Sequence, residues 1–339
     1  MAAGRGAIVA LDGHGAEQGL DVLAEGVRLA AADGIRVRVF GASGLELGGA
    51  DGAELIATEE SIANEDDAVP AVRSRPDASV VRAAADVAAG ESAAMVSHGS
   101  TGATMAAATF GLRRLQGVQR PALAVRLPVP GKPVLFLDVG ANVEVRPQHL
   151  VQFAFLGAAF SEAVLGVSAP RVGLLSVGEE SGKGREEVVA AHEMLSGAEG
   201  IDFIGNVEGR DLTDAVADVV VTDGFTGNVS LKLMEGTARR VTGAIRGAAR
   251  SNPVSALGGL MMRPALGGLR RELHPDTTGG AILLGLRGIA VVGHGSAGAE
   301  GIANSVRLAA RSIEADAIGR TAELIREGGV GRGVIGNER

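Results

Sequence analysis

Short, continuously apolar runs alternate with longer amphipathic stretches along most of the chain, and this alternation limits the folds that it can adopt. The apolar runs are residues 7–11, 37–40, 93–97, 134–137, 172–176, 203–205, 219–222 and 289–293. The helix-like stretches are residues 19–32, 77–89, 101–115, 147–165, 185–195, 227–249 and 301–326. Apolar strands separated by helices are typical of a sheet that is buried on both faces. We therefore predict an α/β fold, doubly wound, with a mainly parallel sheet and helices on both faces.

The alternation breaks near residues 251–280, where we expect a helical insertion. The chain has 339 residues, enough for a large core, and no fixed-period repeat is visible. We expect a single large α/β domain over residues 1–327, with an inserted basic and apolar helical segment at about 239–274. The Gly-rich residues 328–339 are expected to form a flexible tail.

Missing residue types exclude several classes of protein. The chain has no Cys, Trp or Tyr and has 8 Phe. Without cysteine it forms no disulfide, thiolate zinc site, iron–sulfur cluster or cysteine nucleophile, and it suits a reducing, cytoplasmic compartment. Base-stacking recognition of nucleic acid needs exposed aromatic side chains, so we expect no nucleic-acid partner.

Targeting and metal-binding patterns are also missing. The first apolar stretch reaches Asp12 too soon for a signal peptide, and no apolar run reaches 18 residues, the length of a membrane span. No two of the six His are four residues apart, and no compact acidic motif stands out. We expect no metal and no cofactor.

Gly-rich loops follow the apolar runs, where ligands bind in parallel α/β folds. Residues 96–103 and 292–299 are identical at six of eight positions. Glycine lets the backbone approach a ligand, and the first N–H groups of a helix bind anions. We predict two oxyanion cradles that face one crevice and suit phosphate; the residues are Ser100, Thr101, Gly102, His294 and Ser296. Tight strand-to-helix turns favour Gly and Ser for structural reasons too, and neither loop has a nucleotide fingerprint.

Four further loops pair glycine with a polar side chain. Asn142, Asn206 and Asn228 are candidate donors to an oxyanion, although Asn beside Gly also forms ordinary turns. Lys183 lies between two glycines, and lysine is rare in a chain whose other basic residues are almost all arginine. Its structural alternative is a solvated loop lysine. Asp223 is a candidate to orient Lys183 or Asn228, with a helix N-cap as the alternative.

Taken in order, these loops resemble the bacterial phosphate acyltransferase family PlsX, from residue 7 to about residue 311. The matching blocks are Ser-x-Gly-x-Thr-Gly-Ala (97–103), Asp-Val-Gly-Ala-Asn (138–142), Gly-Glu-Glu-x-Gly-Lys-Gly (178–184), Gly-Asn-Val-Glu-Gly-Arg-Asp (205–211), Asp-Gly-Phe-x-Gly-Asn-Val (223–229) and His-Gly-Ser (294–296). The blocks 205–211 and 223–229 are the most specific.

The resemblance implies an acyl-ACP:phosphate acyltransferase, which transfers a long-chain acyl group from acyl carrier protein to inorganic phosphate. The acyl phosphate then feeds phospholipid synthesis. The family resembles isocitrate-type dehydrogenases and phosphotransacetylases in fold, and its members are cytosolic homodimers that associate peripherally with the membrane. Its functional lysine, aspartate and asparagine map onto Lys183, Asp223 and Asn228.

Two blocks depart from the family pattern. The usual opening Asp-Ala-Met-Gly-Gly-Asp is replaced by residues 12–17, Asp-Gly-His-Gly-Ala-Glu. The usual Ala-Gly-Asn-Thr-Gly-Ala is replaced by residues 98–103, so that His98 adds an imidazole and Ser100 puts a hydroxyl in place of an amide. Both departures bear on substrate preference and on activity.

The residues suit this chemistry independently of the resemblance. When phosphate attacks a thioester carbonyl, negative charge develops on the carbonyl oxygen beside an anionic nucleophile, and preorganised donors and a cation stabilise both. We assign Lys183 to the phosphate and oxyanion charge, Asn228 to the oxyanion and Asp223 to orienting one of them. Without cysteine, direct attack is the simplest path, while a serine intermediate remains an alternative.

One segment carries a charge opposite in sign to that of the whole chain. The formal net charge is −8, but residues 239–271 hold seven Arg and no Asp or Glu, a net charge of +7. Apolar residues lie in the same segment. A stripe of this kind suits an anionic membrane surface or an acidic carrier protein. The candidate contacts are Arg263, Arg270, Arg271, Leu260, Met261 and Met262; a dimer-interface helix is the alternative.

Three other functions compete with this assignment. A phosphotransacetylase acting on acyl-CoA shares the phosphate nucleophile and is distinguished by its donor thioester. A non-catalytic lipid-sensing homologue is suggested by the two changed blocks and predicts binding without turnover. An NAD-dependent dehydrogenase is disfavoured because no dinucleotide glycine fingerprint follows the first strand.

Overall fold

The computed structural model describes residues 7–127, 129, 132, 134–272 and 275–331, with side chains left out at 263–267, 269–272 and 275. Over these residues one sheet of eleven strands has the order β3-β2-β1-β4-β11-β10-β5-β6-β9-β7-β8. The strands are β1 (Ile8–Asp12), β2 (Arg36–Gly41), β3 (Ala53–Ala57), β4 (Ala94–Ser97), β5 (Ala122–Leu127), β6 (Val134–Leu137), β7 (Arg171–Leu175), β8 (Asp202–Val207), β9 (Val219–Val221), β10 (Ala281–Leu284) and β11 (Ile289–Val292). All neighbours pair in parallel except β11–β10, β10–β5 and β5–β6.

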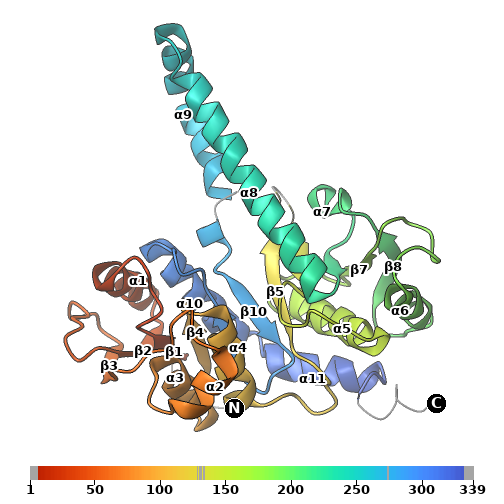
Figure 1. Ribbon diagram of the computed structural model, residues 1–339, viewed down its shortest axis with the longest axis horizontal. Helices are drawn as coiled ribbons and strands as arrows, with labels where there is room; N and C mark the ends of the chain where they lie inside the picture. The colour runs from red at the N-terminus through yellow and green to blue at the C-terminus, as the bar shows by residue number, and fades with distance from the viewer. Residues whose placement is uncertain (1–6, 128, 130–131, 133, 273–274, 332–339) are drawn as a thin grey trace.

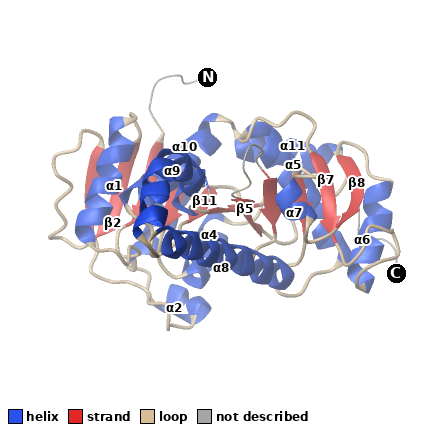
Figure 2. Cartoon of the chain, turned by 90° about the horizontal axis from the view of Figure 1, so that it is seen from above, coloured by secondary structure: helices blue, strands red, loops and turns tan. Residues whose placement is uncertain are grey.

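Helices cover both faces of this sheet, as Figure 2 shows. One face packs against α1 (Leu20–Ala32), α5 (Pro147–Ala163), α6 (Glu186–Ser196), α10 (Ala299–Glu314) and α11 (Ala317–Glu327). The other packs against α2 (Ala68–Ser74), α3 (Ser79–Ala88), α4 (Thr101–Leu112), α7 (Asp211–Asp214) and the start of α8 (Gly224–Ala249). The predicted doubly wound, mainly parallel fold is confirmed.

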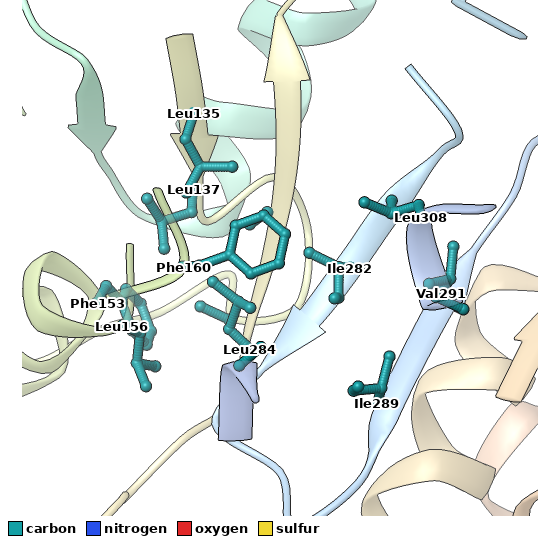
Figure 3. Close-up of a cluster of buried hydrophobic side chains, with 14 of the residues drawn as sticks. Leu135, Leu137, Phe153, Leu156, Phe160, Ile282, Leu284, Ile289, Val291 and Leu308 are labelled. Carbon is teal, nitrogen blue, oxygen red and sulfur yellow. The ribbon is translucent and has the colours of Figure 1, made fainter. Parts of the chain in front are cut away.

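The core on the first face is built around α5, which is buried along almost its whole length. Phe160 reaches from this helix to side chains of the two strands that flank β5, namely Leu137 on β6 and Ile282 and Leu284 on β10 (Figure 3). Phe160 is 2% exposed. Alternate side chains of a strand point to the same face, so β6 and β10 each present an apolar row to α5.

A helical hairpin projects from the body of the molecule (Figure 1). It consists of α8 and α9 (Pro253–Glu272), which run antiparallel and contact each other. The turn is set by sequence: Pro253 occupies the first helical position and Asn252 Oδ1 accepts the Ser255 N–H at 2.9 Å. Gly259 lets the helices approach closely, because a Cβ there would lie 2.9 Å from Cβ of Ala249.

The region from 251 to 280 is therefore largely helical, as predicted, and ends in the 3₁₀ turn η1 (Pro275–Thr277). The helix that leads into it begins earlier than the basic segment, because α8 starts at Gly224. Strand β10 follows immediately and returns the chain to the middle of the sheet.

Candidate active site

The loop after β4 is fixed to strand β1 by a buried carboxylate. Asp12, 4% exposed, accepts hydrogen bonds from the hydroxyl of Ser79 at 2.6 Å and from that of Ser97 at 2.7 Å. Ser97 Oγ in turn accepts the Gly99 N–H at 3.1 Å. This chain of bonds holds the first predicted cradle at the carboxyl ends of β1 and β4.

The first turn of α4 forms the rest of this cradle. Ser100 is its N-cap and accepts the Ala103 N–H at 3.4 Å, while Thr101 is exposed. Helix α2 packs against the same turn, because a Cβ on Gly102 would lie 3.1 Å from Cβ of Ala68. Helix α2 therefore lies directly beside the first cradle.

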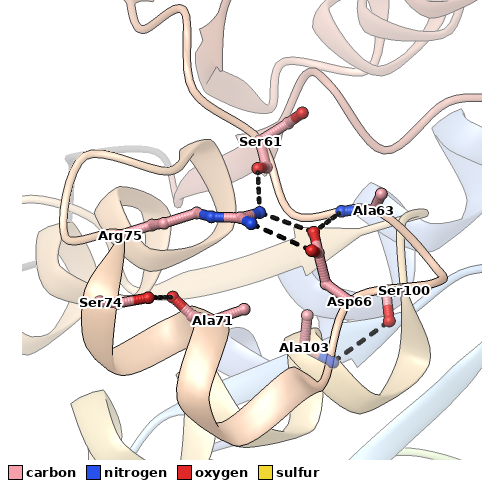
Figure 4. A network of polar contacts seen from close by, with 8 residues as sticks. All are labelled: Ser61, Ala63, Asp66, Ala71, Ser74, Arg75, Ser100 and Ala103. Atoms are coloured by element: carbon pink, nitrogen blue, oxygen red, sulfur yellow. Dashed lines mark hydrogen bonds and ion pairs between the residues drawn. The ribbon is translucent and has the colours of Figure 1, made fainter.

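A polar network braces the segment that leads into α2 (Figure 4). Arg75 donates to both carboxylate oxygens of Asp66, at 2.6 and 3.0 Å, and to the carbonyl oxygen of Ser61 at 3.2 Å. The guanidinium holds the pKa of the Asp66 carboxyl below its usual value. Asp66 also accepts the Ala63 N–H at 2.9 Å. These contacts, all within residues 61–75, stabilise the conformation of this segment beside the cradle.

Residues 13–17, which belong to the changed opening block 12–17, contact both cradles. A Cβ on Gly15 would overlap the backbone of Gly99 in the first loop. Glu17 donates its N–H to the carbonyl oxygen of Gly295 in the second loop, at 3.1 Å. The departure from the family pattern therefore falls where the two loops are joined.

The second loop follows β11 and ends at the N-terminus of α10. His294 is exposed, and its Nδ1 lies 2.9 Å from Oγ of Ser296. These two predicted residues are thus brought together. Either the hydroxyl donates to the imidazole or the reverse, depending on the tautomer.

A second buried carboxylate organises the loop after β6. Asp138 is fully buried and accepts four backbone N–H groups, those of Leu123, Gly140, Ala141 and Asn142, at 2.7–3.1 Å. Burial raises the pKa of Asp138, and these N–H donors oppose the rise. The loop is therefore held by one side chain at its centre.

The amide of Asn142 is part of the same framework. It donates to Asp138 Oδ2 at 2.8 Å and to the carbonyl oxygen of Pro121 at 2.7 Å. Both N–H bonds of the amide are engaged, so this conformation has no donor left for an oxyanion.

Asn206, near the end of strand β8, also has its amide engaged by protein groups. Its Nδ2 donates to the carbonyl oxygen of Glu180 at 2.8 Å, and its Oδ1 lies 3.0 Å from Nδ1 of His192. The same Glu180 carbonyl accepts the Lys183 N–H at 3.0 Å. Asn206 therefore fixes the loop that carries Lys183.

The Lys183 side chain is exposed at the end of this loop. Its carbonyl oxygen accepts the Ser176 hydroxyl at 2.8 Å, and Gly184 follows with φ of +110°, a conformation that favours glycine. Within the described part of the chain, the ammonium has no ion pair or hydrogen bond. The motif thus presents a cation on a fixed backbone.

Asp223 caps α8 and pairs with a residue that sequence reasoning missed. Its Oδ1 accepts the Thr226 N–H at 2.9 Å, and its Oδ2 accepts from the Arg185 guanidinium at 2.7 Å. The Asp223 side chain is 4% exposed and that of Arg185 is 53% exposed. The expected partners of Asp223 were Lys183 or Asn228, whereas the described contacts are with Arg185 and the helix backbone. A usable signal was the position of Arg185, two residues after the glycine-flanked Lys183.

A cavity of about 150 Å³ joins the two cradles to α8. Thr101 from the first loop, Gly293 and His294 from the second, and Asn228 and Lys232 from α8 line it. It is smaller than the ~300–1,000 Å³ pockets that hold whole small molecules, so it suits a small anion better than an acyl chain. Of the predicted residues, it gathers Thr101, Asn228 and His294. The others lie outside its wall; they are Ser100, Gly102, Asn142, Lys183, Asn206, Asp223 and Ser296.

Lys232 also lines the cavity, and the sequence assigned it no role. It lies one helical turn after Asn228 on the same face of α8. Its ammonium is 3.1 Å from Oε2 of Glu235, which also lines the cavity. The helical spacing of these residues was the available signal.

The residues predicted to contact a partner or a membrane lie on α9. Leu260, Met261 and Met262 are 61%, 77% and 56% exposed. The side chains of Arg263, Arg270 and Arg271 lie outside the described residues. Among the described helices, none is long and apolar enough to cross a membrane, and no cluster of three His, Asp or Glu side chains is found over the same residues.

Solved structures identify the class of fold. A phosphotransacetylase from Streptococcus pyogenes matches 91% of this chain and 94% of its own with a TM-score of 0.60 at 17% identity. A branched-chain phosphotransacylase from Enterococcus faecalis matches 91% of this chain and 99% of its own with a TM-score of 0.57 at 16% identity. The chain has the phosphotransacetylase-like α/β fold, as the resemblance predicted.

The chain belongs to the family described as fatty acid synthesis protein, whose model matches residues 8–320. A relative from Elusimicrobium minutum named phosphate acyltransferase is 47% identical over 263 residues, 77% of each chain. Another of that name, from Thermobifida fusca, is 42% identical over 332 residues, 95% of this chain and 91% of the relative. The predicted membership of the phosphate acyltransferase family, and with it of the acyltransferases, is confirmed.

Proposed function

We propose that this protein transfers a long-chain acyl group from acyl carrier protein to inorganic phosphate, giving an acyl phosphate for phospholipid synthesis. The observation that carries the proposal is the small cavity between the two glycine loops and α8, in a chain whose relatives are named phosphate acyltransferase. The size of the cavity suits a small oxyanion, and Thr101, His294 and Lys232 place hydrogen-bond donors on its partly apolar wall.

Phosphate binds in this cavity between the first turns of helices. Helix N-termini carry partial positive charge and free N–H groups, which attract anions. The hydroxyl of Thr101 and the imidazole of His294 add donors from either side, and Lys232 adds a positive charge when the anion competes with Glu235. This arrangement holds the nucleophile before the thioester arrives.

The reaction is a direct acyl transfer. A phosphate oxygen attacks the thioester carbonyl carbon, the C–S bond breaks, and the carrier leaves as a thiolate that takes up a proton. Asn228 donates to the oxyanion that forms on the carbonyl oxygen, and Lys183 reduces the charge of the oxyanion and phosphate together. Asp223 and Arg185 act as a pair that fixes the start of α8, and Asn228 lies one turn into that helix.

The donor decides between this function and an acyl-CoA phosphotransacetylase. Thiol release is measured with acyl carrier protein thioesters and with CoA thioesters of matched chain length, each with and without phosphate. We expect phosphate-dependent release from long-chain carrier thioesters at a kcat/KM at least tenfold above that with CoA. A preference for short-chain acyl-CoA would contradict the proposed donor, and ligand binding without any turnover would indicate a lipid-sensing homologue.

The hairpin of α8 and α9 is the proposed docking surface. Val254, Leu257 and Met261 are 82%, 61% and 77% exposed near its outer part, within the basic segment 239–271. Exposed apolar side chains flanked by arginines suit an anionic membrane surface and an acidic carrier protein. We place the protein at the inner face of the cell membrane, peripherally bound, and propose that it works as a homodimer.

A further inference from the structure

His98 lies buried between the two cradles and takes no part in the chemistry proposed above. It is 1% exposed and directly follows strand β4. Its Nε2 lies 3.1 Å from Oγ of Ser305 on α10, the helix that follows the second loop. Ser305 is one of the residues that line the small cavity. One imidazole thus connects the first cradle to the helix behind the second.

The proton positions in this contact follow from the neighbouring bonds. Ser305 Oγ donates its single proton to the carbonyl oxygen of Gly301, at 3.0 Å. His98 Nε2 must therefore carry the proton and donate to Ser305 Oγ. Nδ1 is then an acceptor, and it is buried without a partner among the described residues. The bond to Ser305 is what the imidazole adds beyond filling space.

The same ring limits the position of the second loop. A Cβ on Gly293 would overlap Cδ2 and Nε2 of His98, so the ring lies directly on the Gly293 backbone. Gly293 donates its N–H to the carbonyl oxygen of Ser97 at 2.8 Å, immediately before His98. The two loops therefore meet at this ring, and a change in its volume or hydrogen bond shifts one loop against the other.

His98 remains an uncharged donor in this place. Burial, with a smaller contribution from the charge of His294, lowers the pKa of His98 to about 4. A neutral, fully buried imidazole does not attract phosphate by charge. Its effect on phosphate must act through the backbone and the residues that it contacts.

We propose that His98 is a positioning residue for phosphate: it sets the second loop against the first through Gly293 and Ser305. This rests on the proposed function, because the loops are taken to cradle the phosphate nucleophile. Loss of the bond to Ser305 lets the cradles separate and weakens phosphate binding. The acyl donor is bound elsewhere, so its KM is unaffected.

The test compares three single variants with the wild type. His98→Leu fills the space without a donor, His98→Gln keeps an N–H near the Nε2 position, and Ser305→Ala removes the acceptor. We expect KM for phosphate to rise roughly tenfold in His98→Leu and in Ser305→Ala, the factor that corresponds to ~1.4 kcal/mol. KM for the acyl donor should stay within twofold, and His98→Gln should recover most of the phosphate affinity.

A second readout needs no turnover. Inorganic phosphate raises the Tm of a protein that binds it in the folded state, and the rise should be smaller in His98→Leu and Ser305→Ala than in the wild type. Should His98→Leu fail to fold, Ser305→Ala alone must show the selective loss. Unchanged phosphate KM and an unchanged Tm shift in a folded variant would overturn the inference.

These outcomes separate the inference from the function on which it rests. If the wild type makes no phosphate-dependent product yet phosphate stabilises it through His98, the proposed reaction fails and the positioning role stands. If the wild type is active and the variants bind phosphate normally, the reaction stands and the positioning role fails. Gly293→Ala adds a control. As a single substitution it should impair phosphate binding, and the double variant Gly293→Ala, His98→Ala should recover part of that binding.

Discussion

At the scale of single residues, the site contains two kinds of polar side chain. Asp12 and Asp138 are buried and hold loops through several hydrogen bonds each. Lys183 and Asn228 are exposed and belong to fixed backbone segments. The first kind serves folding, and the second kind is available to a substrate. Substitution of an exposed side chain should therefore change rate far more than stability.

We predict that Lys183→Ala lowers kcat by at least ~10²-fold, the scale of losing one donor to an oxyanion. Stability should change by less than ~0.5 kcal/mol, because the side chain is exposed. Lys132→Ala removes another exposed loop lysine and is the matched control. Steady-state kinetics of the two variants settles the assignment: near-normal kcat in Lys183→Ala would remove Lys183 from the mechanism.

A pH effect follows from His98. Its pKa is about 4 in the folded protein and near 6.5 in the unfolded chain, so the unfolded state binds more protons between these values. Folding stability contributed by a neutral His98 is complete above pH ~6.5 and is lost as the pH falls toward 4, by up to ~1.4 kcal/mol per pH unit.

The measurement is urea unfolding of the wild type and His98→Gln from pH 7 to pH 4. Other groups also titrate there, among them His149, whose pKa burial lowers, so the informative quantity is the difference between the two proteins. The wild type should lose stability more steeply on acidification. Parallel curves would mean that His98 is not held neutral.

At the scale of elements, the start of α8 is docked on the loop after β6 through glycines. Gly224 donates its N–H to the carbonyl oxygen of Asn142 at 2.7 Å. A Cβ on Gly227 would overlap the carbonyl oxygen of Asp138. The motif Asp-Gly-Phe-Thr-Gly-Asn therefore combines an N-cap, two close backbone contacts and the Asn228 side chain.

Gly227→Ala should destabilise the protein by ~1–3 kcal/mol, because the added methyl forces α8 away from the loop. It should also lower kcat, since Asn228 moves with the helix. Gly236→Ala is the control on the same helix: nothing lies within 4 Å of its added Cβ, and alanine there should stabilise by up to ~1 kcal/mol. Chemical denaturation of both variants checks this, and equal effects would refute the close docking.

Sequence patterns were good predictors of the strands whose residues are all buried. Strand β6 was predicted at its observed bounds because all four residues are apolar and buried. Strand β3 contains Glu54 and lies at the sheet edge, β5 contains the exposed Arg126, and β10 begins directly after the region assigned to the insertion; none of these three strands was predicted. Each of the three antiparallel pairings involves β5 or β10, so the sequence predicted a mainly parallel sheet without locating its antiparallel strands.

The sequence predicted which loops form the candidate site, but it did not predict the hydrogen-bond partners of the side chains on those loops. Glycine-rich turns after strands are local signals, and they located the loops after β4 and β11 that are proposed to cradle phosphate. Whether an amide donates to a ligand or to the backbone depends on tertiary neighbours. Asn142 bonds to Pro121, and Asn206 bonds to Glu180, over 20 residues away in the chain. The pairing of Asp223 with Arg185 is equally long-range.

At the scale of the whole molecule, the basic and apolar segment lies apart from the body that contains the candidate site. The body holds the sheet and the cavity, and the projecting hairpin carries the basic, apolar segment (Figure 1). An overall charge of −8 would repel an anionic surface, so we expect the proposed attraction to come through the hairpin, which carries a charge of +7 over residues 239–271.

We predict that the double variant Leu260→Ser, Met261→Ser binds vesicles containing anionic lipid at least tenfold more weakly than the wild type. Both side chains are mostly exposed, so folding should be unaffected. Val216→Ser, which alters an exposed valine on the body, is the control. Flotation at two salt concentrations measures the binding. Unchanged flotation of the double variant would assign the hairpin to another partner, including a second copy of the chain.

In the proposed reaction, phosphate accepts an acyl group that a carrier protein delivers. The most direct measurement incubates the purified protein with long-chain acyl carrier protein and labelled inorganic phosphate and detects acyl phosphate. We expect labelled product that depends on both substrates and falls at least ~10²-fold in Lys183→Ala. Thioester cleavage that proceeds equally without phosphate, yielding free fatty acid and no labelled product, would contradict it.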